Sequence, residues 1–177
     1  MAFDRDKFKS LVHYVCWKAG DPAKLGAIKL NKICWLADFL AFYETDRAIT
    51  DARYVRRQFG PVPSAIQPVL RELQNEGILR ITEAPFHDYI KREFAPLVEP
   101  DPDVFSEKEL ELIDWTTQYV CNEHTAASIS KASHDHIWQA AADGEEIPYF
   151  TIFALPGTLT DSEREWAALQ IEEMRSN

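Results

Sequence analysis

Apolar residues at helical spacing predict two helices at the start of the chain. Residues 4–19 carry such a stripe, and Asp4 stands where an N-cap residue belongs. Residues 27–44 are apolar nearly all round, from Ile28 to Tyr43. A helix with so little polar surface is expected at the centre of a domain, covered by its neighbours on several sides.

The middle of the chain predicts a third helix followed by a hairpin. Residues 45–60 read as a loop with a short extended piece near Tyr54, and residues 60–63 (GPVP) as a rigid turn. A helix then ends near Glu76, with Pro68 either in its first turn or at a kink. Strands are predicted at 78–81 and 88–94, with Ala84 and Pro85 between them. Helix, glycine and hairpin together outline a winged-helix-like element.

The second half is predicted to be helical. Prolines and acids break the pattern at 99–103, which we interpret as a connection within a single domain spanning 1–177. A capping box at Ser106 opens a helix to about 123, and shorter helices follow at 125–133 and 135–142. Residues 147–154 are apolar and partly β-prone, and a second capping box predicts an extra C-terminal helix at 160–175. The fold class is therefore mainly α: a helical bundle around a central hydrophobic helix, with one small β-hairpin.

Charge and hydropathy restrict the classes of partner. The 19 basic and 29 acidic residues give a formal net charge of −10, which repels nucleic-acid phosphates at long range. The longest apolar run, near residues 33–43, is interrupted by Asp38 and is too short to cross a membrane. The first ten residues lack the apolar segment of a signal peptide. We therefore expect a cytoplasmic protein with no membrane partner, whose three cysteines are small buried hydrophobes.

Motifs for catalysis are absent from the sequence. It has no phosphate-binding glycine loop, no HExxH and no GxSxG, so we expect neither an enzyme nor a bound cofactor. His134 and His136, with His124 upstream, form the best candidate metal site, but no third ligand is identifiable. We therefore expect no metal, with one histidine of the pair capping or packing and the other facing water.

A basic cluster gives the candidate contact surface. Arg53, Arg56 and Arg57 precede Phe59 and the Gly-Pro turn. On a winged-helix outline these arginines could touch DNA, but the next helix presents Glu72 and Glu76, which suit DNA poorly. We therefore expect Arg53 to Phe59 to contact a protein, with Trp166 on the C-terminal helix as a second contact.

Several short motifs occur in the order found in one family. They are residues 29–33 (KLNKI), 59–63 (FGPVP), 73–79 (LQNEGIL), Ser133-His134 with Trp138, and 147–149 (IPY). Together they resemble the SocA-like antitoxins, also called the Panacea domain, over about residues 8–153. The motif residues look structural rather than catalytic: Lys29, Leu30, Lys32, Gly60, Pro61, His134, Trp138 and Tyr149.

The resemblance implies an antitoxin without enzymatic activity. Members of this family are mainly helical and neutralise toxins by binding them directly, and at least one is a proteolytic adaptor that delivers its toxin to a Clp protease. The expected partner is therefore a cognate toxin protein. Delivery to a Clp-type protease, or binding of its own operator DNA, remains an alternative at this point.

Overall fold

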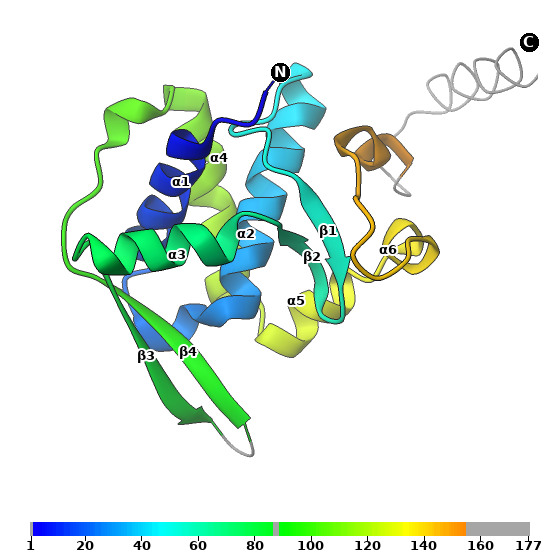
Figure 1. The fold of residues 1–177 in the computed structure, drawn as a ribbon. Helices are drawn as coiled ribbons and strands as arrows, with labels where there is room; N and C mark the ends of the chain where they lie inside the picture. The colour runs from blue at the N-terminus through cyan, green and yellow to red at the C-terminus, as the bar shows by residue number, and fades with distance from the viewer. Residues whose placement is uncertain (1, 87–88, 155–177) are drawn as a thin grey trace, which may run out of the picture.

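Helix α2 (Pro22–Thr45) lies at the centre of the fold, as its apolar pattern predicts (Figure 1). The structure is a computed structural model that describes residues 2–86 and 89–154. Gly26, with φ 65° and ψ 165°, breaks the helical backbone after the first turn of α2. The continuous part of the helix therefore begins at residue 27, where the sequence places it.

Helices from both halves of the chain pack on α2. Helix α1 (Arg5–Lys18) begins at the predicted cap, because Asp4 accepts a hydrogen bond from the backbone N–H of Lys7 at 2.9 Å. Helix α4 (Glu107–Gln118) begins at the predicted capping box of Ser106. The core joins residues before and after the 99–103 connection. One prediction is wrong at the end of α2: Tyr43 is 39% exposed, although one side of its ring packs against Phe153 with centroids 5.6 Å apart.

A hairpin that the sequence does not predict follows α2. Residues 60–63, interpreted above as a rigid turn, form strand β2 (Gly60–Pro63), which pairs antiparallel with β1 (Tyr54–Arg57). Arg57 pairs with Gly60 across a two-residue turn, so the pairs at Pro61 and Pro63 fall at positions where neither strand needs a ladder N–H. The two prolines therefore remove no hydrogen bond from the hairpin.

The winged-helix-like outline is present. Helix α3 (Ile66–Asn75) has Pro68 in its first turn, and Gly77 follows with φ 70°. Strands β3 (Leu79–Phe86) and β4 (Tyr89–Pro96) form a hairpin longer than predicted. Ala84 and Pro85, predicted to lie between the strands, lie within β3, where Pro85 pairs with Ile90. This second hairpin projects from the body of the molecule (Figure 1).

The second half is mostly short helical pieces. The 3₁₀ turn η1 (Pro102–Val104) precedes α4, and the π-helical turn η2 (Tyr119–Glu123) continues it. Helices α5 (Ala126–Ala132) and α6 (His136–Ala140) follow, the latter ending earlier than predicted. Most of residues 147–154, predicted to be apolar and partly β-prone, form the 3₁₀ helix η3 (Tyr149–Ala154) instead. Just before this helix, the Ile147 N–H donates a hydrogen bond to the Tyr54 carbonyl. The predicted helix at 160–175, with Trp166, lies outside the described residues. The mainly α fold class is confirmed.

Candidate protein-binding surface

The β1–β2 hairpin is fixed to α2 through Lys32 and Gly60. Lys32 is 1% exposed, and its Nζ donates to the Pro61 carbonyl at 2.9 Å. Gly60 has φ 100°, and a Cβ there would collide with Ser133 Oγ and lie 2.6 Å from Lys32 Nζ. Only glycine combines this backbone conformation with so close an approach. The close packing of Lys32, Gly60 and Ser133 therefore restricts where each of the three residues can lie.

Burial sets the charge of Lys32. Desolvation lowers its pKa to about 7. The pKa of the neighbouring His134 is lowered as well, first by burial and then by the charges of Lys32 and Arg56. His134 Nε2 is buried without a hydrogen-bond partner among the described residues. A positive charge is thus energetically unfavourable on the inner side of the hairpin.

A second buried group, Asp38, fixes the start of β1. Its carboxylate accepts hydrogen bonds from the Thr50 N–H at 2.8 Å, the Thr50 hydroxyl at 2.6 Å and the Tyr54 hydroxyl at 2.7 Å. Burial raises the pKa of Asp38 to about 6, although these three donors oppose the rise. The Tyr149 hydroxyl donates to the Ala52 carbonyl at 2.6 Å and so links η3 to the segment just before β1. One signal in the sequence points to this group, an acid inside an apolar run.

The outer side of the hairpin is fastened by α5, α6 and the segment after α6. Ser130 Oγ donates to the Phe59 carbonyl at 3.2 Å, and Trp138 Nε1 donates to the Arg57 carbonyl at 3.0 Å. The Arg56 N–H donates to the Glu145 carbonyl at 2.8 Å. Side-chain and backbone bonds thus hold the two-residue turn from several directions, and Phe59 remains 51% exposed at its tip.

Trp138 joins the hairpin to the His134 corner. The His134 ring stacks on the indole with centroids 3.7 Å apart and planes 10° apart. The Arg56 guanidinium carbon lies 4.3 Å from the indole centroid, and Arg56 Nε donates to the Trp138 carbonyl at 3.1 Å. Arg56, predicted as an exposed contact, is therefore half-buried and holds the hairpin to α6. His134 packs and His136 is exposed, which is the predicted division of the pair.

The two exposed arginines are paired with acids that the sequence did not connect to them. Arg53 Nε lies 2.8 Å from a Glu146 oxygen, and Arg57 Nη1 lies 3.0 Å from an Asp143 oxygen. Both pairs are half exposed, so each contributes less than about 1 kcal/mol to stability. We call the exposed side chains of Arg53, Arg57 and Phe59 the hairpin surface. It presents an exposed aromatic ring and two charge-compensated arginines.

The remaining motif residues lie elsewhere on α2. Leu30 is fully buried in the core, and Lys29 is buried with its Nζ 3.2 Å from the Cys121 carbonyl. Desolvation is the main reason that the pKa of Lys29 is lowered. The structure therefore gathers Lys32, Gly60, Pro61, His134 and Trp138 around the hairpin, and leaves Lys29 and Leu30 to the packing of α2.

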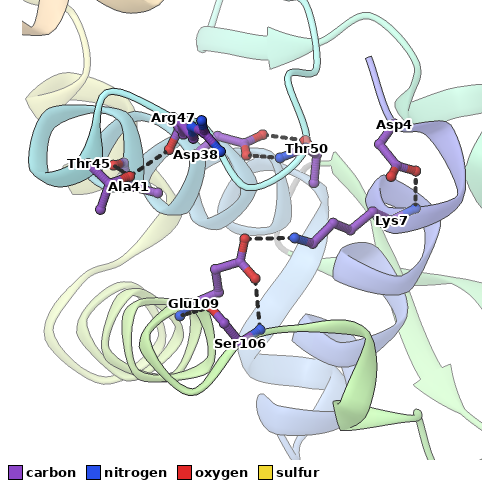
Figure 2. Close-up of polar contacts among 9 residues, drawn as sticks. All are labelled: Asp4, Lys7, Asp38, Ala41, Thr45, Arg47, Thr50, Ser106 and Glu109. Atoms are coloured by element: carbon purple, nitrogen blue, oxygen red, sulfur yellow. Dashed lines mark hydrogen bonds and ion pairs between the residues drawn. The ribbon is translucent and has the colours of Figure 1, made fainter. Parts of the chain in front are cut away.

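A cavity of about 420 Å³ lies at the far end of α2, between the N-terminal residues, the loop after α2 and the start of α4. Figure 2 shows the Lys7–Glu109 ion pair, at 2.7 Å, on one side of this region and the Asp38–Thr50 bonds on another. Its charged lining residues have both signs, for example Lys7 and Arg47 against Asp4 and Glu109. The lining shows no preference for an anion or a cation.

Within residues 2–86 and 89–154, no group of three or more His, Cys, Asp or Glu side chains is placed to hold a metal ion. No helix in the same ranges combines the length and the apolar character that a transmembrane segment requires.

One family model matches the chain, over residues 30–139, and its description is antitoxin SocA-like, Panacea domain. The match begins in α2 and ends in α6, so it includes both strands of the β1–β2 hairpin and the His134–Trp138 corner. No curated protein and no solved structure matches the chain. Because the matched segment covers more than half of the 177 residues, the chain belongs to the SocA-like antitoxin family, the Panacea domain.

Proposed function

We propose that this protein is the antitoxin of a toxin–antitoxin pair and neutralises a cognate protein toxin by binding it directly. The hairpin surface is the proposed contact, and Trp166 of the C-terminal segment stays a second predicted contact. The observation that carries the proposal is the exposed Phe59 ring on a backbone that the core holds in place. Aromatic anchors on rigid elements dominate protein interfaces, because little conformational entropy is lost when they bind.

The charges of the hairpin surface support a protein partner over DNA. Arg53 and Arg57 are each paired with a carboxylate, and Arg56 is engaged by Trp138. Phosphate binding would first have to break these pairs in a chain of net charge −10. Glu72 and Glu76 of α3 already pair with Arg5 and Lys9 of α1, which uses this helix within the fold. A gel shift on the protein's own promoter at low salt tests the operator alternative.

Co-expression tests the proposal. The product of the neighbouring gene should stop growth when expressed alone, and this protein should restore growth and co-purify with it. The Phe59→Ala variant should weaken binding by about tenfold or more, the loss typical of an anchor residue. Ile90→Ala is the matched control, because Ile90 is an apolar side chain, 67% exposed, on the other hairpin. A harmless neighbour, or equal rescue by Phe59→Ala and wild type, would argue against this function.

Blocking a toxin and delivering it to a Clp-type protease both begin with binding. The two mechanisms differ in the half-life of the toxin, which falls in the presence of an adaptor and is unchanged or longer with a blocking antitoxin. Pulse-chase measurement of the toxin with and without this protein, in cells with and without the protease, separates them. Phe59→Ala should cancel the effect in either case, because it removes the shared binding step.

A further inference from the structure

Helix α4 and the turn η2 carry a polar stripe that faces solvent. All but the last of its members follow one another at intervals of three or four residues, so they lie along one side of the helix, and Glu123 adjoins Asn122 at its end. The opposite side is buried against the core at Ile113, Thr116 and Thr117. We define the α4 face as these exposed residues: Glu107, Glu111, Trp115, Gln118, Asn122 and Glu123.

An aromatic stack lies at the centre of the α4 face. Trp115 is 54% exposed, and its ring is stacked on Tyr119 with centroids 5.2 Å apart and planes 6° apart. Tyr119 in turn meets the edge of His124 at 4.7 Å, and His124 Nδ1 lies 3.0 Å from Ser128 Oγ. Tyr119 begins the π-helical turn η2, a distortion found often at functional sites. The large exposed indole is thus held in one orientation by its neighbours.

The acids of the α4 face are not neutralised by the fold. Among the described residues, Glu107, Glu111 and Glu123 form no ion pair, whereas Glu109 and Asp114 pair with Lys7 and Lys18. Glu107 also lies in the first turn of α4, where a negative charge is favourable to the helix. That reason does not extend to Glu111 or Glu123, which are further along. The exposed cation beside them, Lys108, pairs with Glu44 of α2 at 3.0 Å, so within the described part of the chain the face combines unpaired negative charge with one open aromatic ring.

We propose that the α4 face docks a basic segment of a protein partner, with an arginine side chain against Trp115 and neighbouring cations on Glu111 and Glu107. Guanidinium groups stack on indole rings and bind carboxylates through two hydrogen bonds, so arginine suits both features. Charge complementarity selects a cationic partner over an acidic or neutral one. This surface lies on α4 and not on the β1–β2 hairpin, and it does not depend on the proposed antitoxin activity.

The spacing of the α4 face indicates the pattern of the partner. Side chains four residues apart on a helix are separated by about 6 Å. Alternate side chains of an extended chain lie on one side at intervals of about 7 Å. An extended segment with arginine at every second position can therefore place one cation on each of Glu107, Glu111 and Trp115.

A defined peptide tests the proposal in the absence of any toxin. Fluorescence anisotropy at about 150 mM salt, where long-range attraction is screened, would measure binding of a labelled peptide of alternating arginine and serine. Trp115→Ala should weaken binding about two- to fivefold, the range of an exposed cation–π contact. Glu111→Gln should weaken it about two- to threefold, and the double variant should lose more than either.

Glu83→Gln is the matched control, because Glu83 is an exposed acid on the β3–β4 hairpin and its loss changes the net charge equally. Unchanged binding by this variant, together with absent binding of an alternating glutamate–serine peptide, would support a specific docking face. Failure to bind the arginine peptide would overturn the proposal. Equal losses for Glu83→Gln and Glu111→Gln with none for Trp115→Ala would also overturn it, since attraction would then follow net charge alone. Thermal unfolding of each variant checks that the fold is retained.

Discussion

Replacing Lys32 by methionine tests how the hairpin is fastened to α2. Methionine keeps the length of the side chain and removes the amine that donates to the Pro61 carbonyl. Two effects on stability then oppose each other. Losing the hydrogen bond leaves a buried acceptor unsatisfied and costs about 1–3 kcal/mol at every pH. Losing the amine also removes the cost of burying it, and that cost depends on pH.

The pH-dependent part follows from the two pKa values of Lys32. Its ordinary pKa is 10.5, and burial lowers it to about 7 in the folded protein. Between these values the unfolded chain binds a proton that the folded chain releases, so the free energy of unfolding rises with pH. From pH 7 to pH 9 the wild type should gain about 2 kcal/mol from this group alone. Lys32→Met should lack this gain.

Urea unfolding of both proteins at pH 7 and at pH 9, followed by tryptophan fluorescence, measures the effect. Groups that do not interact with Lys32 titrate alike in the two proteins and cancel when the difference between variant and wild type is taken. His134, whose pKa Lys32 helps to lower, has an ordinary pKa of 6.5, which lies below this pH range. That difference should therefore shift by about 2 kcal/mol in favour of the wild type on raising the pH. A difference that stays the same at both pH values would show that Lys32 is charged in the folded protein and refute the reasoning.

Three further substitutions test local structure. Gly60→Ala should destabilise the protein by at least about 2 kcal/mol by urea unfolding, because the new Cβ meets Ser133 and Lys32 in addition to the strained backbone. Gly77→Ala, where φ is also positive but no atom lies within 4 Å, should cost only about 1 kcal/mol, and equal losses would contradict the steric argument. Ser106→Ala should lower the free energy of unfolding by about 1 kcal/mol through loss of the capping box, and no change would show that the cap is not needed.

The helices could be predicted because their signals are local. The apolar stripe of α1 and its Asp4 cap lie within one segment, as do the Ser106 box and the start of α4. The centrality of α2 followed from the absence of a polar face, which leaves a helix no side for water. Each of these inferences needed only residues within about four turns of one another.

The β1–β2 hairpin could not be predicted, because the effect of its prolines depends on the register in which the two strands pair. A proline is unfavourable in a strand only where its N–H would join the ladder. The two-residue turn at Gln58 and Phe59 places Pro61 and Pro63 at the alternate positions, and the Ser64 N–H resumes the bonding to the Arg53 carbonyl at 2.8 Å. The position of the turn decides which residues of β2 donate to the ladder, and the amino-acid composition of the segment does not show where the turn lies.

The exposure of the predicted contact segment follows only in part from the sequence. The segment from Arg53 to Phe59 was predicted as a contact from its charge, and four of its side chains are exposed: Arg53, Arg57, Gln58 and Phe59. The acids that neutralise it could not be predicted, because Asp143 and Glu146 follow it by more than eighty residues. The half-buried state of Arg56 depends on Trp138 in the same way. Long-range pairs of this kind are set by how α5 and α6 close over the hairpin.

Asp38 and Lys32 together show what the centre of the molecule contributes to its surface. Both are buried on α2, and they hold opposite parts of the hairpin, Asp38 at Tyr54 and Lys32 at Pro61. The raised pKa of Asp38, about 6 against an ordinary 3.8, means that stability is lost as the pH rises from 3.8 toward that value. The lowered pKa of Lys32, about 7, means that stability is lost as the pH falls toward that value. Near neutral pH both groups therefore lower the stability of the fold, so their contribution is to fix the position of the hairpin, and with it the orientation of Phe59.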